Sequence, residues 1–399
     1  MLKLAPLKEA QQFIDELRGR YYFKRDIETV EVGDALGREL AESIISKKAS
    51  PKYNVSTMDG YAINYEDDYP LKVVGDIHAG EEDVPKLKRG TAVWIATGAR
   101  LPDEANAVLR VEDAKVKNGE LFGPKLDDWK YIIRKGTDYK KGELILDLKT
   151  RVGPHIIAIL HNLGVSKVKV FKRIKVGVFS TGDEIFKGLI HDTNGPMIMA
   201  FLKEWGCDAD YLGTIPDDFE ITKKMLLEAT KYDVIVTSGG VSVGRRDFVI
   251  KAIEDIGEVL LHKVKTRPGK PMVVGLIKET PVFALPGKPT GSFVAVELNL
   301  RRYILGNMPR PKMQCVCSKE VNLPKEKETL GATYITFAHI REGKAHPIGY
   351  RGSSIQLFSS KSEYGVSIVA SSQRAMVADG YIMTDKKINE GDTVEVNLF

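Results

Sequence analysis

The stretch from Ile174 to Phe248 constrains the fold more than any other part of the 399-residue chain. Short apolar runs rich in valine and isoleucine alternate there with amphipathic segments of helical length. This alternation is typical of βαβ units, which build a parallel sheet with helices on both faces. We therefore predict a doubly wound α/β domain, whose ligands bind beyond the carboxyl ends of its strands.

Three turns follow apolar runs that we predict to be strands of this sheet. The turns at 180–184 and 216–218 carry carboxylates, and the turn at 238–244 is rich in glycine, with Asp247 just beyond it. Because the carboxyl ends of parallel strands meet at one edge of a sheet, we expect the three turns to form one site.

The glycine-rich turn begins with Ser238, Gly239 and Gly240. Glycines let backbone N–H groups approach an anion closely, and a following helix adds its positive end. The alternative is a turn that binds nothing. The residues match neither the Walker pattern nor the dinucleotide-binding pattern, so the turn predicts an anion site of another kind.

The carboxylates Glu184 and Asp217 have two interpretations. Two carboxylates at adjacent strand ends repel each other unless a cation lies between them, and their oxygens suit Mg²⁺ that also bridges to phosphates. Alternatively, Asp183, Glu184, Asp217 and Asp218 begin helices, where acidic residues offset the helix dipole. The residues themselves do not separate Asp217 from Asp218 as the metal ligand.

Two stiff turns carry positive charge. The turn 267–271 holds Arg267 and Lys270 between prolines, and the turn 286–289 holds Lys288. Facing the predicted site, these side chains could clamp an oxyanion, because Arg and Lys bind such ions through charge-assisted hydrogen bonds. The alternative is a pair of solvated loops.

Composition excludes several classes of protein. The formal net charge is only +5, and no block of Lys and Arg with interleaved aromatics indicates nucleic-acid binding. Three cysteines are too few for a disulfide framework and favour a reducing compartment. Without a signal peptide or an apolar run of membrane-spanning length, we expect a cytoplasmic protein.

The rest of the chain indicates further domains. From residue 54 to residue 133, short strands and repeated turn signals predict a separate, mostly β lobe. Residues 306–311 read as a linker, and the short alternating strands beyond them predict a small β domain to which we assign no chemistry.

Motifs along essentially the whole chain closely resemble those of the molybdopterin molybdenumtransferases, the MoeA family that includes the gephyrin E domain. The two most specific motifs are Ser-x-Met-Asp-Gly-Tyr-Ala at 56–62 and Thr-Ser-Gly-Gly-Val-Ser-x-Gly at 237–244. The others stand at 97–99, 180–184, 192–194, 267–271 and 285–289, with Asp247.

The resemblance implies an elongated, multidomain subunit. Its central domain is a doubly wound parallel α/β domain of the molybdopterin-binding type, at 173–308. A mostly β lobe is inserted at 51–136, and a linking α/β region is formed by 1–50 and 137–172. A small β domain occupies 309–399.

The resemblance also implies an activity. The enzyme would insert molybdate or tungstate into adenylylated molybdopterin, with Mg²⁺-dependent release of AMP. It would act as a homodimer whose active sites are shared between subunits. Its further partners would be the molybdopterin adenylyltransferase and apo-molybdoenzymes or apo-tungstoenzymes. Neither nucleic acid nor a membrane is expected as a partner.

The same resemblance suggests roles for individual residues. Glu184 and Asp217 correspond to metal ligands. Asp59, Thr97, Asp138 and Asp247 correspond to catalytic residues, the first three supplied by the lobe region of the other subunit. The residues that correspond to cofactor-binding positions are Thr181, Gly182, Ser238, Gly239, Gly240, Ser242, Arg267, Lys270, Pro286, Gly287 and Pro289.

Two departures and two alternatives accompany this hypothesis. Lys288 replaces the family's usual asparagine, and Thr290-Gly291-Ser292 replaces Val-Ser-Ala, which displaces a serine by one position.

One alternative function is a scaffold or carrier that binds molybdopterin and partner proteins without turnover. The other is a molybdopterin adenylyltransferase, against which the lobe and the C-terminal β domain argue.

Overall fold

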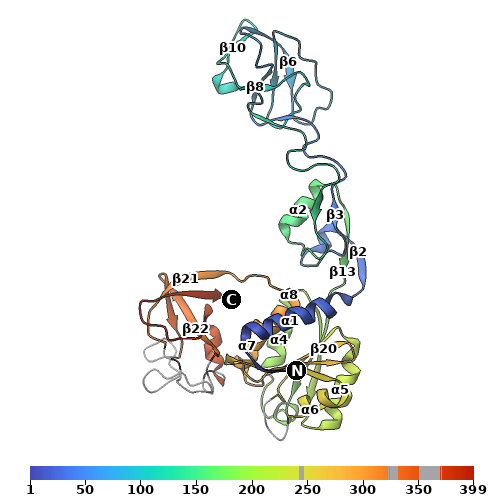
Figure 1. Ribbon diagram of the computed structural model, residues 1–399, viewed down its shortest axis with the longest axis vertical. Coiled ribbons are helices and arrows are strands. Elements are labelled where there is room, and N and C mark those ends of the chain that lie inside the picture. Colours follow the sequence, from blue (N-terminus) through green and yellow to red (C-terminus); the bar gives the residue numbers. More distant parts are fainter. Residues whose placement is uncertain (242–246, 322, 324–330, 350–368, 370) are drawn as a thin grey trace. The chain divides into compact units, whose positions relative to one another are not determined.

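The computed structural model describes residues 1–241, 247–321, 323, 331–349, 369 and 371–399 (Figure 1). The chain divides into two compact units. Unit 1 contains residues 1–28 and 171–399, and unit 2 contains residues 29–170. The finer division into four domains stays a prediction.

Unit 1 is built on the predicted α/β sheet, which has seven strands. Their order is β1 (Leu2–Ala5), β17 (Glu258–Val264), β19 (Val273–Ile277), β20 (Thr280–Leu285), β16 (Val234–Ser238), β14 (Lys175–Thr181) and β15 (Asp208–Ile215). The four strands from β20 to β15 are parallel, as predicted. Strand β19 runs antiparallel to both neighbours, because a two-residue turn with Lys278 at φ 55° joins it to β20.

Helices cover both faces of this sheet, which confirms the doubly wound class (Figure 1). One face packs against α1 (Leu7–Tyr21), α4 (Asn194–Glu204), α7 (Pro289–Ala295), the π-helical turn Val296–Leu300 and α8 (Arg301–Leu305). The other face packs against α5 (Phe219–Glu228) and α6 (Phe248–Ile256). On β16, Val234 and Val236 enter the first core and Ile235 enters the second, so these consecutive residues are all apolar.

The first residues of the chain differ from expectation. The predicted linking domain included residues 1–28, but these residues pack in unit 1. Strand β1 pairs in parallel with β17, and Ala10, Ile14 and Leu17 of α1 are buried in the first core. A strand of four residues beside the N-terminus carries too little pattern to be predicted.

The predicted small β domain is confirmed as a closed sheet. Its strands are β21 (Lys312–Cys317), β22 (Thr333–Arg341), β23 (Lys344–Pro347), β24 (Gly380–Thr384) and β25 (Thr393–Leu398). A pairing of β22 with β24 closes the ring, and β18 (Thr266–Arg267) adds to β22 in parallel. The small domain is therefore hydrogen-bonded to the start of the cationic turn 267–271.

Unit 2 contains the predicted short strands. A six-stranded sheet has the order β8 (Ala107–Arg110), β5 (Gly60–Ile63), β7 (Thr91–Ile95), β6 (Leu71–Ile77), β10 (Glu120–Phe122) and β9 (Lys115–Lys117). Two-stranded pairs join β4 (Val55–Ser56) to β11 (Ile132–Ile133), β3 (Ile44–Ile45) to β12 (Leu144–Leu146), and β2 (Ile27–Glu31) to β13 (Lys167–Phe171). Helix α2 (Pro154–Asn162) begins at a proline.

Short elements complete the described chain. They are α3 (Asp183–Phe186) and the 3₁₀ helices Tyr22–Lys24, Val32–Ala35, Val111–Asp113, Ala229–Lys231 and Gln373–Val377. Within the described ranges, none of the helices has the length and apolar character needed to cross a bilayer.

Candidate functional site

A cleft of about 940 Å³ lies in unit 1 where β14, β16 and β20 end. The predicted turns therefore meet, as the position of strand ends in an α/β sheet requires. The predicted residues that line the cleft are Thr181, Gly182, Glu184, Asp217, Ser238, Gly239, Gly240, Asp247, Arg267, Lys270, Pro286, Gly287 and Pro289. Ser242 lies outside the described residues. The chemical roles of all these residues remain predictions.

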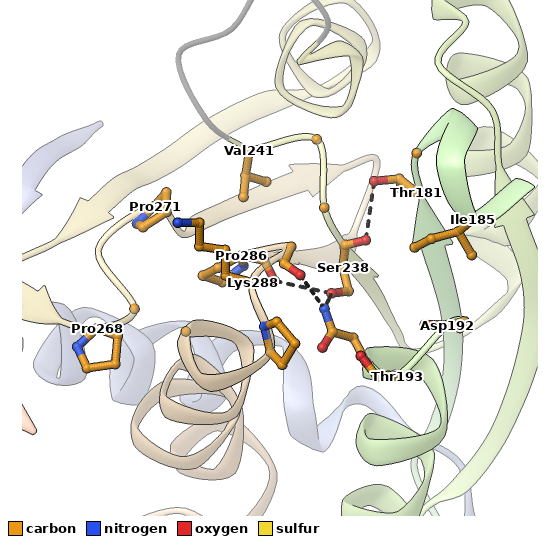
Figure 2. Close-up of a pocket in the computed structure, with 18 of the residues that line it drawn as sticks. Thr181, Ile185, Asp192, Thr193, Ser238, Val241, Pro268, Pro271, Pro286 and Lys288 are labelled. Atoms are coloured by element: carbon orange, nitrogen blue, oxygen red, sulfur yellow. Dashed lines mark hydrogen bonds between the residues drawn. The ribbon is translucent and has the colours of Figure 1, made fainter. Parts of the chain in front are cut away.

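The two glycine-containing turns that follow β16 and β20 are held together by hydrogen bonds (Figure 2). The hydroxyl of Ser238 donates to the carbonyl oxygen of Pro286 at 3.2 Å. The amide nitrogen of Asn194 donates to Ser238 Oγ at 2.9 Å and to the carbonyl oxygen of Gly287 at 2.8 Å. Residues far apart in sequence thus fix one local shape at the floor of the cleft.

These bonds limit how the turn at Ser238 can bind an anion. The Ser238 hydroxyl proton is directed to Pro286, and the N–H of Gly239 donates to the carbonyl oxygen of Leu285 at 2.9 Å. Of the three residues that begin this turn, Gly240 has an N–H that donates no hydrogen bond within the described part of the chain. An anion at this turn would therefore meet the N–H of Gly240 first.

Gly239 is required by its conformation and by its surroundings. Its φ is +105°, a region that L side chains rarely adopt. A Cβ atom at this position would lie 2.5 Å from Thr181 Oγ1 and 2.8 Å from the Thr181 carbonyl oxygen. The close approach of β14 and β16 at their ends therefore depends on a residue without a side chain.

The structure separates the two aspartates that follow β15. Asp218 caps α5, because its Oδ1 accepts a hydrogen bond from the N–H of Ile221 at 2.8 Å. Asp217 lines the cleft instead, and its own N–H donates to Asp183 Oδ1 at 3.1 Å. Capping thus explains Asp218, and Asp217 is the aspartate of the two that lines the cleft.

In the turn at 180–184 too, one acidic residue forms contacts within the protein and the other lines the cleft. Asp183 accepts the Asp217 N–H and forms an ion pair with Lys187 at 2.6 Å, whereas Glu184 lines the cleft. Gly182, between β14 and α3, has φ +128°, and a Cβ there would lie 2.7 Å from Glu184 Oε1. Gly182 therefore leaves room for the Glu184 carboxylate.

The carboxylates at this end of the cleft fit Mg²⁺ only in combination with a phosphate. Among the residues that the structure describes, no group of three or more His, Cys, Asp or Glu side chains could hold a metal ion. Mg²⁺ is commonly bound by one or two carboxylates together with substrate phosphates and water. Glu184 and Asp217 supply such a pair of oxygen donors on one cleft.

Positive side chains reach the cleft from two turns. Arg267 ends β18, Lys270 lies in the turn that follows, and Lys288 precedes α7. Figure 2 shows Pro268, Pro271 and Lys288 on one side of the cleft and Thr181 and Ile185 on the other. The cations thus come from other turns than the carboxylates. We call the turns 267–271 and 286–289 the cationic wall of the cleft, and the turns 180–184 and 216–218 its carboxylate wall.

The small β domain also contributes to the cleft, although no motif in its sequence predicts a chemical role. Its Gln373 lines the cleft, and the hydroxyl of Thr290 in α7 donates to the carbonyl oxygen of Ser372 at 2.7 Å. No sequence motif marks Gln373, because the contact depends on how the small domain packs.

Asp192 and Asn194 are further cleft residues to which we had assigned no role. Asp192 Oδ2 accepts hydrogen bonds from Ser180 Oγ at 2.6 Å and from the Tyr211 hydroxyl at 2.8 Å. Its Oδ1 accepts the N–H of Gly195 at 3.0 Å, which anchors the start of α4. Burial raises the pKa of Tyr211, which keeps its hydroxyl protonated as a donor. The motif at 192–194 was the available signal.

The predicted lobe residues lie in unit 2. Thr97 donates to Asp59 Oδ1 from its N–H at 2.6 Å and from its hydroxyl at 2.8 Å. Those two bonds, the backbone one foremost, hold the pKa of Asp59 below its usual range. Asp138 lies in another turn, where its N–H donates to the carbonyl oxygen of Ser50 at 3.0 Å.

Gly60, beside Asp59, shows why this motif contains glycine. A Cβ on Gly60 would lie 2.1 Å from the carbonyl oxygen of Leu109 on the paired strand β8. The strand that presents Asp59 can therefore pair with β8 only if the next residue has no side chain.

Comparisons with known proteins give a consistent result. A model of the MoeA N-terminal region (domain I and II) matches residues 5–164, and a model of a probable molybdopterin binding domain matches residues 177–305. The chain is 31% identical to a molybdopterin molybdenumtransferase of Bacillus subtilis, with 86% of each chain covered. It is 28% identical to a putative molybdopterin biosynthesis protein of Methanocaldococcus jannaschii, over 99% of this chain and 98% of that one.

The fold has a counterpart among solved structures. The crystal structure of a molybdopterin biosynthesis MoeA protein from Pyrococcus horikosii matches with a TM-score of 0.70 and 32% sequence identity. The match covers 99% of each chain. Both the sequence and the fold are thus shared over nearly the whole length.

Proposed function

Because this chain belongs to the MoeA family of molybdopterin molybdenumtransferases, which act in molybdenum cofactor biosynthesis, we propose a specific reaction for it. The protein inserts molybdate or tungstate into adenylylated molybdopterin and releases AMP in a Mg²⁺-dependent reaction. One observation carries this proposal. The cleft that contains Glu184 and Asp217 also contains Arg267, Lys270 and Lys288. A substrate that bears phosphates and an incoming oxyanion needs both kinds of group.

The carboxylate wall suits the nucleotide part of the substrate. Glu184 and Asp217 would hold Mg²⁺, which when bound neutralises charge on phosphate oxygens. Ile185 and Ile190 line the cleft beside them, and Ile190 is 53% exposed. An exposed apolar side chain at a cleft suits a flat ring, so we assign the adenine to this wall.

The cationic wall suits the oxyanion. Molybdate and tungstate are tetrahedral dianions, and Arg267 can donate two parallel hydrogen bonds to such an ion. Lys270 and Lys288 add positive charge without a fixed direction. Lys288 stands where the family's motif usually has asparagine, and its ammonium would add a cation near the ion.

The chain's own groups would assist the release of AMP in two ways. The bond that breaks joins the phosphorus of AMP to an oxygen of the pterin phosphate. The oxygen of a water molecule would bond to that phosphorus, a proton would pass from the water to solvent, and the pterin phosphate would leave. Asp247, which lines the cleft at the start of α6 without capping the helix, would orient the water oxygen. The N–H of Gly240 would donate to charge that develops on a phosphate oxygen.

The lobe residues would complete the site of a second subunit. Asp59 is exposed in unit 2 and is held ionised by two hydrogen bonds from Thr97, so its charge faces solvent. We assign Asp59, Thr97 and Asp138 to the cleft of the partner in a homodimer with two shared sites.

A nucleotide assay tests this function against its alternatives. The purified protein is incubated with adenylylated molybdopterin and Mg²⁺, and molybdate or tungstate is then added. AMP release that requires the oxyanion supports the proposal, and the ion with the lower half-saturating concentration is the preferred substrate. Tight binding without release would indicate a carrier or scaffold, and ATP consumption with molybdopterin would indicate an adenylyltransferase.

A further inference from the structure

Asn194 connects the ends of three strands at the floor of the cleft. It is the first residue of α4, and its side chain is 5% exposed. The start of α4 is anchored to β14 through Asp192, which accepts hydrogen bonds from Ser180 and from the N–H of Gly195. From this anchored position, Asn194 reaches the turns that follow β16 and β20.

The orientation of the Asn194 amide follows from its partners. The carbonyl oxygen of Gly287 can only accept a hydrogen bond, so the amide nitrogen must face it. The same nitrogen donates to Ser238 Oγ, and the Ser238 hydroxyl donates to Pro286. One amide group therefore ties the glycine turn after β16 to the proline turn after β20.

The two turns touch through their backbones. A Cβ on Gly287 would lie 3.5 Å from Gly239 Cα, so little space separates them. Asn194 Oδ1 is buried and has no hydrogen-bond partner among the described residues. The two hydrogen bonds that the Asn194 amide nitrogen donates to the two turns are the bonds that this side chain forms.

We propose that Asn194 is a positioning residue that fixes the glycine turn against the proline turn, so that Gly240 and Lys288 keep their places around the substrate. The expected effect of Asn194 on the reaction rate rests on the proposed function. The coupling of the two turns by Asn194 does not depend on that function. Small displacements of groups that position reactants reduce the rate strongly.

Hydrogen exchange tests the coupling without substrate. Asn194→Asp keeps the shape of the side chain but removes the donor to Gly287. We expect exchange at the Gly239 amide, bonded to Leu285, and at the Ser292 amide, bonded to Lys288, to be at least tenfold faster. The Val264 amide, bonded to Lys270 on the cationic turn, should exchange at its original rate.

Asn397→Ala is the matched control. Asn397 is also 5% exposed and donates from its amide to the Tyr381 carbonyl oxygen, but it belongs to the small β domain. Its loss should not change the ratio of exchange at Gly239 to exchange at Val264. Unchanged exchange at Gly239 and Ser292 in Asn194→Asp, or an equal rise at all three amides, would overturn the proposal.

Kinetics provide a second readout. We expect Asn194→Asp to lower kcat for AMP release at least tenfold while the half-saturating oxyanion concentration changes less than threefold, because Arg267 is held by β18 and β22. The double variant with Ser238→Ala should lose no more activity than the worse single variant. Additive losses, or a change in oxyanion binding alone, would contradict a positioning role.

The outcomes also separate this inference from the proposed function. If the unmodified protein releases no AMP with either oxyanion, the proposed function fails, and the exchange experiment still decides whether Asn194 couples the turns. If Asn194→Asp does not fold, Ser238→Ala replaces it, since it breaks the same connection from the other side. Normal exchange at Ser292 in Ser238→Ala would then refute the coupling.

Discussion

Thr97 directs both its N–H and its hydroxyl to a single oxygen of Asp59, at 2.6 Å and 2.8 Å. Both bonds favour the ionised carboxylate, so the pKa of Asp59 is depressed. We predict that Thr97→Val, which keeps the N–H but removes the hydroxyl, raises this pKa toward its ordinary value. An NMR titration of the Asp59 carboxyl measures the change, and an unmoved pKa would contradict the assignment.

The sign of the pH effect follows from linkage. A carboxyl whose pKa is lower in the folded protein contributes stability at pH above its unfolded pKa. That contribution is lost as the pH falls through the folded pKa, which lies below the ordinary value of 3.8. Asp59 therefore stays ionised near neutral pH, and Thr97→Val should not introduce a new step into the pH profile of activity above pH 5 or so.

Asp217 and Asp218 should respond differently to substitution. Asp217→Asn removes one charged oxygen donor from the cleft, so we expect the half-saturating Mg²⁺ concentration for AMP release to rise about tenfold or more. Asp218→Ala removes the cap of α5 and should lower the free energy of unfolding by about 1 kcal/mol. Mg²⁺ titrations and urea unfolding of both variants check this. The reverse pattern would exchange the two roles.

Arg267→Ala should affect the oxyanion more than the nucleotide substrate. Losing a charge-assisted hydrogen bond costs about 1.5–3 kcal/mol, which corresponds to roughly a 10- to 150-fold rise in the half-saturating molybdate concentration. The KM for adenylylated molybdopterin should change much less. Lys387→Ala, a cation of the small β domain that pairs with Glu320, is the control. Equal losses for both substrates would remove Arg267 from the oxyanion site.

Mixing two inactive variants tests the shared site. Asp59→Ala and Asp217→Ala impair different domains, so a mixed dimer of the proposed kind contains one site with both native residues. Random exchange of subunits should restore about a quarter of the original activity. A mixture of Asp217→Ala with Arg267→Ala, which lie on the same cleft, should restore none. No recovery in the first mixture would indicate sites complete within one subunit.

Local patterns predicted the framework of the site well. The alternation of apolar runs and amphipathic segments placed the ends of β14, β15 and β16, and with them Glu184 and Asp217. The same patterns left Asp217 and Asp218 equivalent. Only the hydrogen bond from the Ile221 N–H assigns Asp218 to capping, because both residues are acidic and adjacent.

Long-range contacts account for what the sequence did not reveal. Asn194 is separated by 44 residues from Ser238 and by 93 from Gly287, and a residue at a helix start gives no sign of such partners. Gln373 reaches the cleft because β18 joins the small β domain to the cationic turn. The antiparallel β19 likewise depends on a turn of two residues, Lys278 and Glu279, which carries no glycine.

The most direct measurement of the central claim is the amount of AMP released per subunit from adenylylated molybdopterin, with Mg²⁺, before and after molybdate or tungstate is added. We predict negligible release before the addition and one AMP for each metal ion inserted after it. At limiting Mg²⁺ the release should be lower in Asp217→Asn, and at limiting oxyanion it should be lower in Arg267→Ala. Release at the same rate without an oxyanion, or none with either ion, would contradict the claim.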